Sequence, residues 1–589
     1  MKKALLFVCM TFGLSAYAQS QSCLPDGLFI SNQTDIDNFQ SNYPGCTEIE
    51  GALLIMGNSI HNLNGLSVLT RVGSKIEVVN CELLQTFSGL EHLVDVGESM
   101  KISDNSHLAD ISALSGLLSI GSNLEIDDNP KLQSLNGLNN LASIEGKLAI
   151  RNCDSLLNFF GLNGLSYIGG DFSIVYNTAL RTLEGIDNIA GIEGALIVGN
   201  NNSLKNLVGF ESVRSLSLLS INGNDSLINL NGLNGLVSVD EIYIFANKAL
   251  SSLSGLDDLA TADVVYIMSN DLLIDLGALL GLETISNTLN IYSNSKLEAL
   301  TGLNNIISVG NSITIDGNQS LQNLAGLNNL SEVIGRLSIQ NNPVLTEISS
   351  LASLSSVGGS INVYNNPMLR SLDGLQQVAS ADTLTIWACP QLTSLQGLED
   401  IYSLKGGLYL SQNDLLTSLA ALTNLSEVAG DLYISSNSSL ESLLGLENIL
   451  ADSIVNLTIV NNALLSECEV RSVCNYLANP NGTTNISNNY IGCSSPFAIE
   501  NACSSGVDEP SNELGFGVYP NPAEGTFYIK TNESTTIELI DLQGKVVYVH
   551  KTENQNGLFT IDISGYKKGL YVVRLTSLDN SKIEKVFVR

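Results

Sequence analysis

The sequence predicts a β-rich solenoid of about 19 stacked rungs followed by a small β-sandwich, and three observations predict the solenoid. A pattern of 23 to 24 residues recurs along most of the 589-residue chain. Each copy, called a rung here, contains a Leu-x-Ile run whose two apolar side chains point to the same side of a strand. Charged residues make up only 14% of the chain, and Asn, Ser, Thr and Gly fill the polar positions, which favours strands and tight turns.

The first element in chain order is a secretory signal at residues 1–18. Lys2 and Lys3 form its basic end, an apolar run follows, and Ala16-Tyr17-Ala18 is a small-x-small cleavage site. No later stretch is long and apolar enough to span a membrane. We therefore expect an exported chain without a transmembrane segment, in which disulfide bonds can form.

The repeat template is L-x-I-x-x-N-x-x-L-x-x-L-x-G-L, as in residues 124–138. The same central position holds Cys81, Cys153 and Cys389 on three rungs. On the other rungs it holds Asn, at Asn58, Asn105, Asn129, Asn177, Asn201, Asn224, Asn247, Asn270, Asn294, Asn318, Asn342, Asn366, Asn413, Asn437, Asn462 and Asn489. A single rung cannot bury its apolar side alone, whereas stacked rungs share a continuous core.

The polar positions of the template have their own predicted roles. An inward Asn can hydrogen-bond turn backbone groups of its own rung and the next, which predicts a ladder of Asn side chains. A Cys at the same place is a small, weakly polar residue that tolerates burial. We therefore expect Cys81, Cys153 and Cys389 to be ladder residues rather than disulfide or metal ligands. The Gly before the last Leu suits a positive φ.

This pattern resembles the leucine-rich repeats, whose Asn/Cys position it shares. The Leu three residues after the Asn, and the recurring L-x-x-I-x-G-x-L-x-I run at residues 141–150, are closest to the receptor L-domain branch. The resemblance covers roughly residues 52–492. It implies a right-handed solenoid with a parallel sheet on one face, but it does not identify a ligand, because such folds serve many binding functions.

The two ends of the repeat need caps that hide the apolar interior. We place an N-terminal cap at residues 19–51, the solenoid at 52–467 and a disulfide-bonded C-terminal cap at 468–503. As in L domains, Cys23 and Cys46 are expected to form a disulfide across the first cap. Cysteines cluster around the last rung, where sequence leaves three pairings open, at Cys468, Cys474, Cys493 and Cys503.

A polar linker at residues 504–513 precedes a C-terminal domain at 514–589. Alternating apolar residues predict short strands, and hence a β-sandwich, at 527–529, 536–540, 545–548, 559–563, 570–575 and 583–588. The motifs resemble the sorting domain of the type IX secretion system of Bacteroidota, through Val518-Tyr519-Pro520-Asn521-Pro522, Gly525-Thr526-Phe527, Asp541-Leu542-Gln543-Gly544-Lys545, Gly569-Leu570-Tyr571 and the end at 585–589. The resemblance implies passage across the outer membrane, removal of the domain, and release or attachment to surface lipopolysaccharide.

Little in the sequence points to catalysis, and we expect no enzyme and no cofactor or metal. The four histidines His61, His92, His107 and His550 are not at ligand spacing, and no hydrolase or phosphate-loop motif is present. Carboxylates such as Asp127 and Asp128 are interpreted as turn polarity rather than as a catalytic pair. The net charge of −33 repels phosphate backbones, which argues against a nucleic-acid partner.

One feature indicates binding. Two positions of each strand face outward, the middle of Leu-x-Ile and the residue after Ile. Aromatic residues make up 6% of the chain, yet they and Met268 concentrate at these positions, as Tyr243, Phe245, Tyr266, Tyr292, Tyr364, Trp387, Tyr409 and Tyr433. Exposed aromatics on stacked rungs would form a stripe that suits sugar rings or protein partners. The alternative is that aromatics simply stabilise neighbouring strands.

These observations favour a secreted or cell-surface recognition or adhesion protein that binds a glycan or protein through the strand face. One alternative is a structural surface spacer without a specific ligand. Another is a polysaccharide-active solenoid enzyme, which would need a carboxylate cluster on the strand face.

Overall fold

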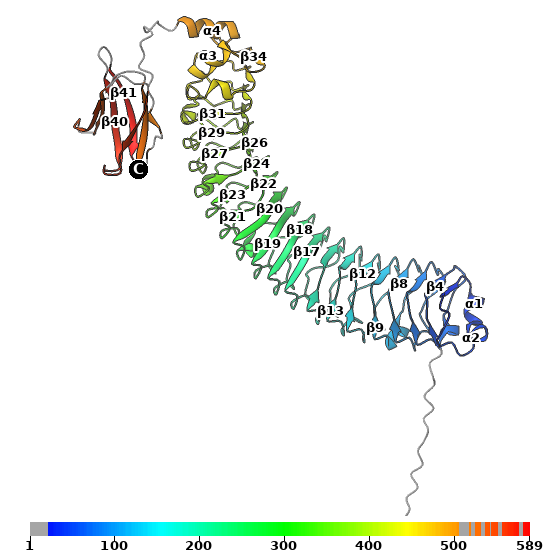
Figure 1. Ribbon diagram of the computed structural model, residues 1–589. Coiled ribbons are helices and arrows are strands. Elements are labelled where there is room, and N and C mark those ends of the chain that lie inside the picture. The colour runs from blue at the N-terminus through cyan, green and yellow to red at the C-terminus, as the bar shows by residue number, and fades with distance from the viewer. Residues whose placement is uncertain are drawn as a thin grey trace, which may run out of the picture. The chain divides into compact units, whose positions relative to one another are not determined.

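Figure 1 shows the computed structural model, which describes residues 22–505, 518–519, 523, 525–531, 536–541, 544–551, 557–576 and 581–588. The chain divides into two compact units, Met1–Cys503 and Ser504–Arg589. The predicted signal at 1–18 and residues 506–513 of the predicted linker lie outside the described residues.

The first unit is a β-solenoid of about 19 rungs, as the repeat predicts. Each rung gives one strand to a parallel ladder in which equivalent positions pair, for example Leu124 with Leu148 and Ile126 with Ile150. The ladder lies on the concave side of the solenoid (Figure 1). Its strands are β2 (Leu28–Ile30), β4 (Leu53–Met56), β6 (Ile76–Val79), β8 (Met100–Ser103), β10 (Leu124–Asp127), β12 (Leu148–Arg151), β14 (Phe172–Val175), β16 (Ala195–Gly199), β17 (Ser215–Asn222), β18 (Ser238–Phe245), β19 (Thr261–Met268), β20 (Thr284–Tyr292), β22 (Ile313–Asp316), β24 (Leu337–Gln340), β26 (Ile361–Tyr364), β28 (Leu384–Trp387), β30 (Leu408–Ser411), β32 (Leu432–Ser435), β33 (Leu457–Val460) and β34 (Thr484–Ser487).

Short parallel strands line the convex side (Figure 1). In the middle of the solenoid, β17 to β20 are eight to nine residues long and include the positions that form separate short strands elsewhere. The short strands are β1 (Ser22–Cys23), β3 (Glu48–Ile49), β5 (Arg71–Val72), β7 (Asp95–Val96), β9 (Ser119–Ile120), β11 (Ser143–Ile144), β13 (Tyr167–Ile168), β15 (Gly191–Ile192), β21 (Ser308–Val309), β23 (Glu332–Val333), β25 (Ser356–Val357), β27 (Ser380–Ala381), β29 (Ser403–Leu404) and β31 (Glu427–Val428).

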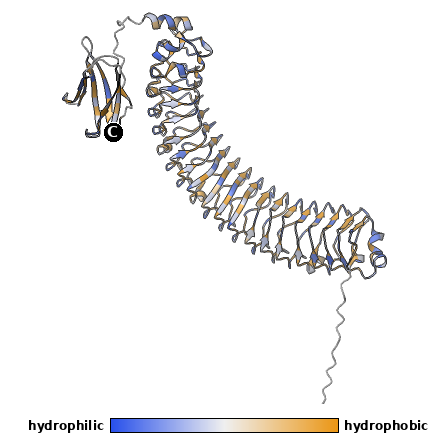
Figure 2. Ribbon diagram, in the orientation of Figure 1, coloured by the Kyte–Doolittle hydropathy of each residue, from blue (hydrophilic) through white to orange (hydrophobic). Residues whose placement is uncertain are grey.

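The apolar template positions fill the space between the two sides. On the template rung Leu124, Ile126, Leu132, Leu135 and Leu138 are all fully buried, and the other rungs repeat this pattern. Figure 2 shows hydrophobic residues recurring in strand after strand along the solenoid. The core is therefore one continuous column to which every rung contributes the same kind of side chain.

The Asn side chains form the predicted ladder, but they reach the preceding rung. The Oδ1 of Asn177 accepts a hydrogen bond from the backbone N–H of Cys153 (3.1 Å), and its Nδ2 donates to the carbonyl of Ile150 (2.9 Å). The backbone N–H of Asn177 itself donates to Oδ1 of Asn201 (3.0 Å). The expectation that each Asn serves the next rung is wrong in direction, because the corner of each rung is already satisfied by the Asn that follows it.

The template glycine has the predicted positive φ, and its absence changes the local structure. Gly302 has φ +116°, and a Cβ there would lie 1.9 Å from the carbonyl oxygen of Leu276. Four rungs carry Ala or Ser at this position and form a 3-10 turn instead, namely η2 (Ser112–Gly116), η3 (Gly277–Leu279), η4 (Ser349–Leu351) and η5 (Ala420–Leu422). Two further 3-10 turns are η1 (Asn64–Leu66) and η6 (Ala451–Ser453).

Helices and disulfides close both ends of the solenoid. Helices α1 (Gln33–Asp37) and α2 (Phe39–Asn42) bury Ile36 and Phe39 against the first rungs, and Cys23 is bonded to Cys46. At the other end, α3 (Arg471–Ala478) and α4 (Pro496–Ser505) follow the last rungs. There Cys468 pairs with Cys493 and Cys474 with Cys503. This is one of the three pairings that the sequence left open.

The second unit contains two antiparallel sheets that share a small buried core. One sheet has the order β35-β36-β39 and the other β38-β37-β40-β41. All six predicted strands are present, within or overlapping these elements. Their bounds are β35 (Val518–Tyr519), β36 (Thr526–Thr531), β37 (Thr536–Ile540), β38 (Val546–Lys551), β39 (Gly557–Asp562), β40 (Gly569–Thr576) and β41 (Ser581–Val588).

Candidate functional site

The concave face presents two columns of outward side chains, because residues two apart on a strand point the same way. We call them the inner column, four residues before the ladder Asn, and the outer column, two residues before it. The strand register stacks each column from rung to rung. Tyr243 pairs with Tyr266 in the inner column, while Phe245, Met268 and Tyr292 follow one another in the outer column.

The first aromatic cluster consists of Tyr243, Phe245, Tyr266, Met268 and Tyr292 on β18 to β20. The ring centroids of Tyr243 and Tyr266 are 5.1 Å apart, and those of Tyr266 and Tyr292 are 6.4 Å apart, each pair with an interplanar angle of 21°. The Tyr243 hydroxyl donates to Glu241 (3.0 Å), and burial followed by this hydrogen bond raises the pKa of Tyr243. These rings are therefore largely engaged with one another and with their own rungs.

Two polar rungs separate the first cluster from the next aromatics. Nε2 of Gln340 donates to Asp316 (2.9 Å), and the hydroxyl of Ser338 donates to the side-chain oxygen of Gln340 (3.3 Å). The predicted stripe is thus divided into two clusters by a hydrogen-bonded polar patch.

The second aromatic cluster consists of Tyr364, Trp387, Tyr409 and Tyr433 on β26 to β32. Tyr364 and Trp387 occupy the outer column, with centroids 6.1 Å apart at 62°. Tyr409 and Tyr433 occupy the inner column, 6.0 Å apart at 36°. Tyr364 is 40% exposed and the other three rings are half-buried. Burial, then the charge and hydrogen bond of Asp431 (3.2 Å), raise the pKa of Tyr409.

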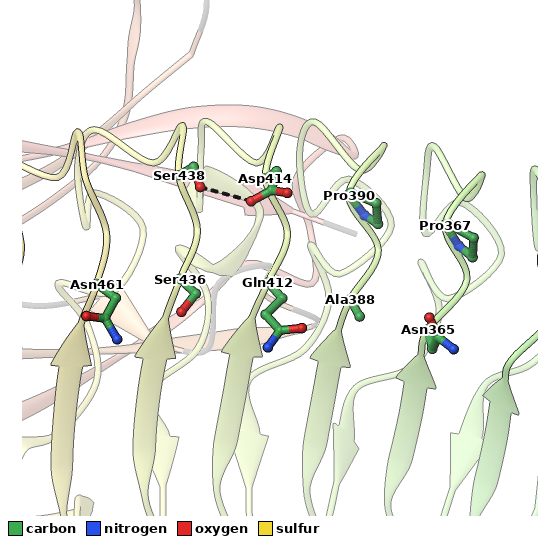
Figure 3. A pocket seen from close by; sticks show the side chains of 9 residues that line it. All are labelled: Asn365, Pro367, Ala388, Pro390, Gln412, Asp414, Ser436, Ser438 and Asn461. Carbon is green, nitrogen blue, oxygen red and sulfur yellow. Dashed lines mark hydrogen bonds between the residues drawn. The ribbon is translucent and has the colours of Figure 1, made fainter.

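A polar groove borders the second cluster, and we call it the corner groove. Its volume is about 380 Å³, and Figure 3 shows its lining as two rows of side chains just beyond the strand ends. One row is the residue before each ladder position, namely Asn365, Ala388, Gln412, Ser436 and Asn461. The other row is Pro367, Pro390, Asp414 and Ser438. The groove adjoins the outer column because Asn365 and Ala388 directly follow Tyr364 and Trp387 in the chain.

The corner residues that line the groove adopt a left-handed backbone. Ala388 has φ +53° and Gln412 has φ +57°, and the equivalent residue of most rungs is also left-handed. Asn tolerates this conformation well, and Asn365 donates to Asn341 of the preceding rung (2.8 Å). Sequence reasoning missed this groove. The sequence carried no specific signal for it, because five earlier successive rungs lack Asn at the corner just as the rungs of Ala388, Gln412 and Ser436 do.

The other residues singled out in the sequence do not form a second centre. Asp128 lies at a corner near Asp104, Asp127 and Asp154, and burial followed by their negative charge raises its pKa. His92 and His107 each hydrogen-bond a backbone carbonyl of the preceding rung, and His61 hydrogen-bonds a carbonyl of its own rung. Among the described residues, no group of three His, Cys, Asp or Glu side chains is arranged to hold a metal ion.

The ladder cysteines are buried. Cys81, Cys153 and Cys389 are the free cysteines of the described chain. Burial raises the pKa of Cys153 to about 12 and that of Cys389 to about 11, although the backbone N–H groups of Asn129 and Asn366, respectively, oppose this rise. The thiols stay protonated at neutral pH, as a packing role requires.

Comparison with known proteins identifies one part of the chain. Residues 517–589 match the family model described as "Secretion system C-terminal sorting domain". The comparison with curated proteins found no match. No helix within the described residues is long and apolar enough to cross a membrane. Of the motifs that suggested this family, Pro520-Asn521-Pro522 lies outside the described residues, whereas β40 and β41 form the sheet edge that ends the chain. The match indicates that the protein is exported by the type IX secretion system and is secreted or held at the cell surface.

Proposed function

We propose that this protein is a non-catalytic recognition protein that binds an extracellular glycan or protein through the concave face of its solenoid. The second aromatic cluster is the centre of the binding face. The observation that carries the proposal is the position of Tyr364 and Trp387, which are partly exposed and directly precede in the chain two residues that line an open polar groove, Asn365 and Ala388.

The geometry of the second cluster supports a ligand-binding role. The first cluster packs its rings nearly parallel, whereas Tyr364 and Trp387 meet edge to face at 62°, and the next two rings lie in the other column. Rings that leave flat surface open to solvent offer rigid contact area at a small cost in conformational entropy. Such residues dominate binding free energy where a groove lets a partner cover them.

We further propose that the C-terminal unit is an address and not part of the binding site. Its small buried core is separate from the continuous core of the solenoid. In this proposal the secretion machinery recognises residues 514–589 and removes them, and the solenoid is then released or attached to surface lipopolysaccharide.

The proposal is tested by replacing three rings of the second cluster. The variant Tyr364→Ala, Trp387→Ala, Tyr409→Ala is compared with the wild-type chain on a glycan array and in pull-down experiments with extracellular proteins. We expect the triple variant to lose ligand capture while its circular dichroism spectrum and thermal unfolding remain those of a folded solenoid.

A matched control removes three aromatic rings outside both clusters. Tyr167→Ala, Tyr176→Ala, Tyr402→Ala deletes the same number of aromatic rings, and Tyr176 and Tyr402 are as exposed as the cluster residues or more so. Capture should survive in this control. Equal capture by the wild-type chain and the second-cluster variant would discard the proposal, and a wild-type chain that binds nothing would favour the structural spacer.

A further inference from the structure

The corner groove carries little charge. Of the nine residues that line it, only Asp414 is ionisable, in a protein whose net charge is −33. That carboxylate accepts a hydrogen bond from the Ser438 hydroxyl (2.9 Å), as the dashed line in Figure 3 shows. A site for a basic ligand would present several carboxylates, and an acidic ligand would be repelled by the protein as a whole. The lining fits an uncharged ligand.

The groove also offers hydrogen-bonding groups of the right kind. On the rungs before it, Asn341 donates to Asp316 (2.7 Å) and Asn365 donates to Asn341 (2.8 Å). On the rung beyond it, Asn488 donates to Asn461 (3.1 Å). Between these linked pairs, the side-chain amide of Gln412 is exposed and has no hydrogen-bond partner among the described residues, so it is free to meet a ligand. It extends toward the space left by the short Ala388 side chain (Figure 3).

An amide presents a donor and an acceptor side by side, which matches two neighbouring hydroxyls of a sugar. The rings of Tyr364 and Trp387, which directly precede the groove residues Asn365 and Ala388 in the chain, match the apolar C–H face of a sugar ring. The corner row runs over five rungs, from Asn365 to Asn461, or about 19 Å at the usual strand spacing. The rung spacing is close to the length of one sugar unit, so an extended chain can meet equivalent groups on successive rungs.

We infer that the corner groove is a subsite for an uncharged glycan chain that runs across the rungs, with its sugar hydroxyls bound by Gln412 and the flanking corner side chains and one sugar face against Trp387. This inference rests on the proposed function and narrows it to one ligand class. A protein ligand is the competing outcome of the test.

The test fills the groove without touching an aromatic residue. Ala388→Asn places an Asn at this corner. Asn341, Asn365 and Asn461 already occupy the equivalent corners in the same left-handed conformation, so the fold should be retained. The control is Ala246→Asn, the same substitution at the corner that follows Phe245, where φ is +57° compared with +53° at Ala388.

The probes are two uncharged polysaccharides, laminarin and yeast mannan, one anionic polysaccharide, alginate, and one cationic polysaccharide, chitosan. Binding to the full chain is measured by affinity electrophoresis and calorimetry. We expect the wild-type chain to bind an uncharged polysaccharide, Ala388→Asn to weaken this binding about tenfold or more, and Ala246→Asn to leave it unchanged.

The outcomes separate this inference from the proposed function. If an uncharged glycan binds and the aromatic triple variant loses it, but Ala388→Asn does not weaken it, the groove is not the subsite and the proposed function stands. If only a protein or a charged polysaccharide binds, and the triple variant loses that ligand, the glycan inference is overturned and the function again stands. If the wild-type chain binds none of the four polysaccharides and no protein, both are overturned.

Discussion

The two aromatic clusters lie on the same concave face, and the rungs beneath them are built differently. The first cluster sits on β18 to β20, which have eight or nine residues, and its tyrosines stack at 21°. The second sits on strands of four residues, its rings are tilted or edge to face, and a groove runs beside it. Similar residues at equivalent repeat positions therefore pack differently, depending on the length of the strands that carry them.

The Asn ladder is continuous under the first cluster and interrupted under the second. Asn247, Asn270 and Asn294 are linked without a break below the first cluster. Below the second cluster Cys389 replaces one Asn, and its thiol has only long contacts to the carbonyls of Val363 (3.9 Å) and Trp387 (3.6 Å). We interpret the first cluster as a stabilising stack and the second as a surface available to a ligand.

The largest expected difference between the clusters is in binding. Tyr364→Ala with Trp387→Ala should weaken ligand binding by more than about 100-fold, because each aromatic anchor of an interface contributes 2 kcal/mol or more. Tyr243→Ala with Tyr266→Ala should weaken it less than about threefold and lower the unfolding midpoint instead. Titration of both double variants by calorimetry or biolayer interferometry measures this, and equal losses would erase the distinction drawn between the clusters.

A large effect on stability is expected below the first cluster. Asn294→Ala removes the acceptor of the Asn270 N–H (3.1 Å) and the donor to the Ile267 carbonyl (3.0 Å), both buried. Leaving these groups unpaired should cost about 2–4 kcal/mol of unfolding free energy, measured by urea denaturation. Asn294→Cys should cost less, because Cys already occupies this position on three rungs. A loss below about 0.5 kcal/mol for the Ala variant would show that the ladder is dispensable.

Below the second cluster, completing the ladder should increase stability. Cys389→Asn supplies an acceptor for the Asn366 N–H and a donor for the Val363 carbonyl, which should stabilise the protein by about 1 kcal/mol. Cys389→Ala is the matched control and should destabilise it. If the Asn variant instead lowers the unfolding midpoint, the cysteine rung is held in a geometry that excludes the amide.

The smallest effect concerns thiol chemistry. Because burial raises the pKa of Cys389 to about 11 from 9.0, the folded thiol should resist iodoacetamide at pH 8. The unfolded Cys389 thiol ionises at a lower pH than the folded one. The protonated thiol therefore favours the folded state below pH 9, and this stabilisation is lost as the pH rises from 9 to 11. Peptide mapping should show Cys389 labelled a few-fold faster than a cysteine introduced by Asn270→Cys. Faster labelling under the first cluster would reverse the order of local stability assigned here.

The parts of the fold that the sequence predicts are those that depend on neighbours at a fixed spacing. Leu124, Ile126 and Asn129 recur because each meets its own equivalent on the next rung, so one copy determines the rest. The left-handed Gly also recurs at a fixed position of the repeat. The 3-10 turns form on the rungs where Ala or Ser replaces this Gly.

The site was harder to predict because it depends on how different rungs combine. The column of each aromatic can be read from its distance to the ladder Asn, four residues for Tyr266 and two for Tyr292. Ring angles and the corner groove cannot, because they depend on side chains from separate rungs, such as Ala388 and Gln412. The pairing of Cys474 in α3 with Cys503 in α4 likewise depends on how these two helices pack at the end of the solenoid.

The backward reach of the ladder amides makes the two ends of any shortened solenoid unequal. If rungs are removed from the start, the first remaining Asn side chain faces water, which can solvate an amide freely. If rungs are removed from the end, the backbone N–H and carbonyl of the last remaining corner lose their side-chain partners on the missing rung, as Cys153 and Ile150 would without Asn177. A fragment that keeps the C-terminal capping helices should therefore be more stable than a fragment of equal length that keeps only the N-terminal cap.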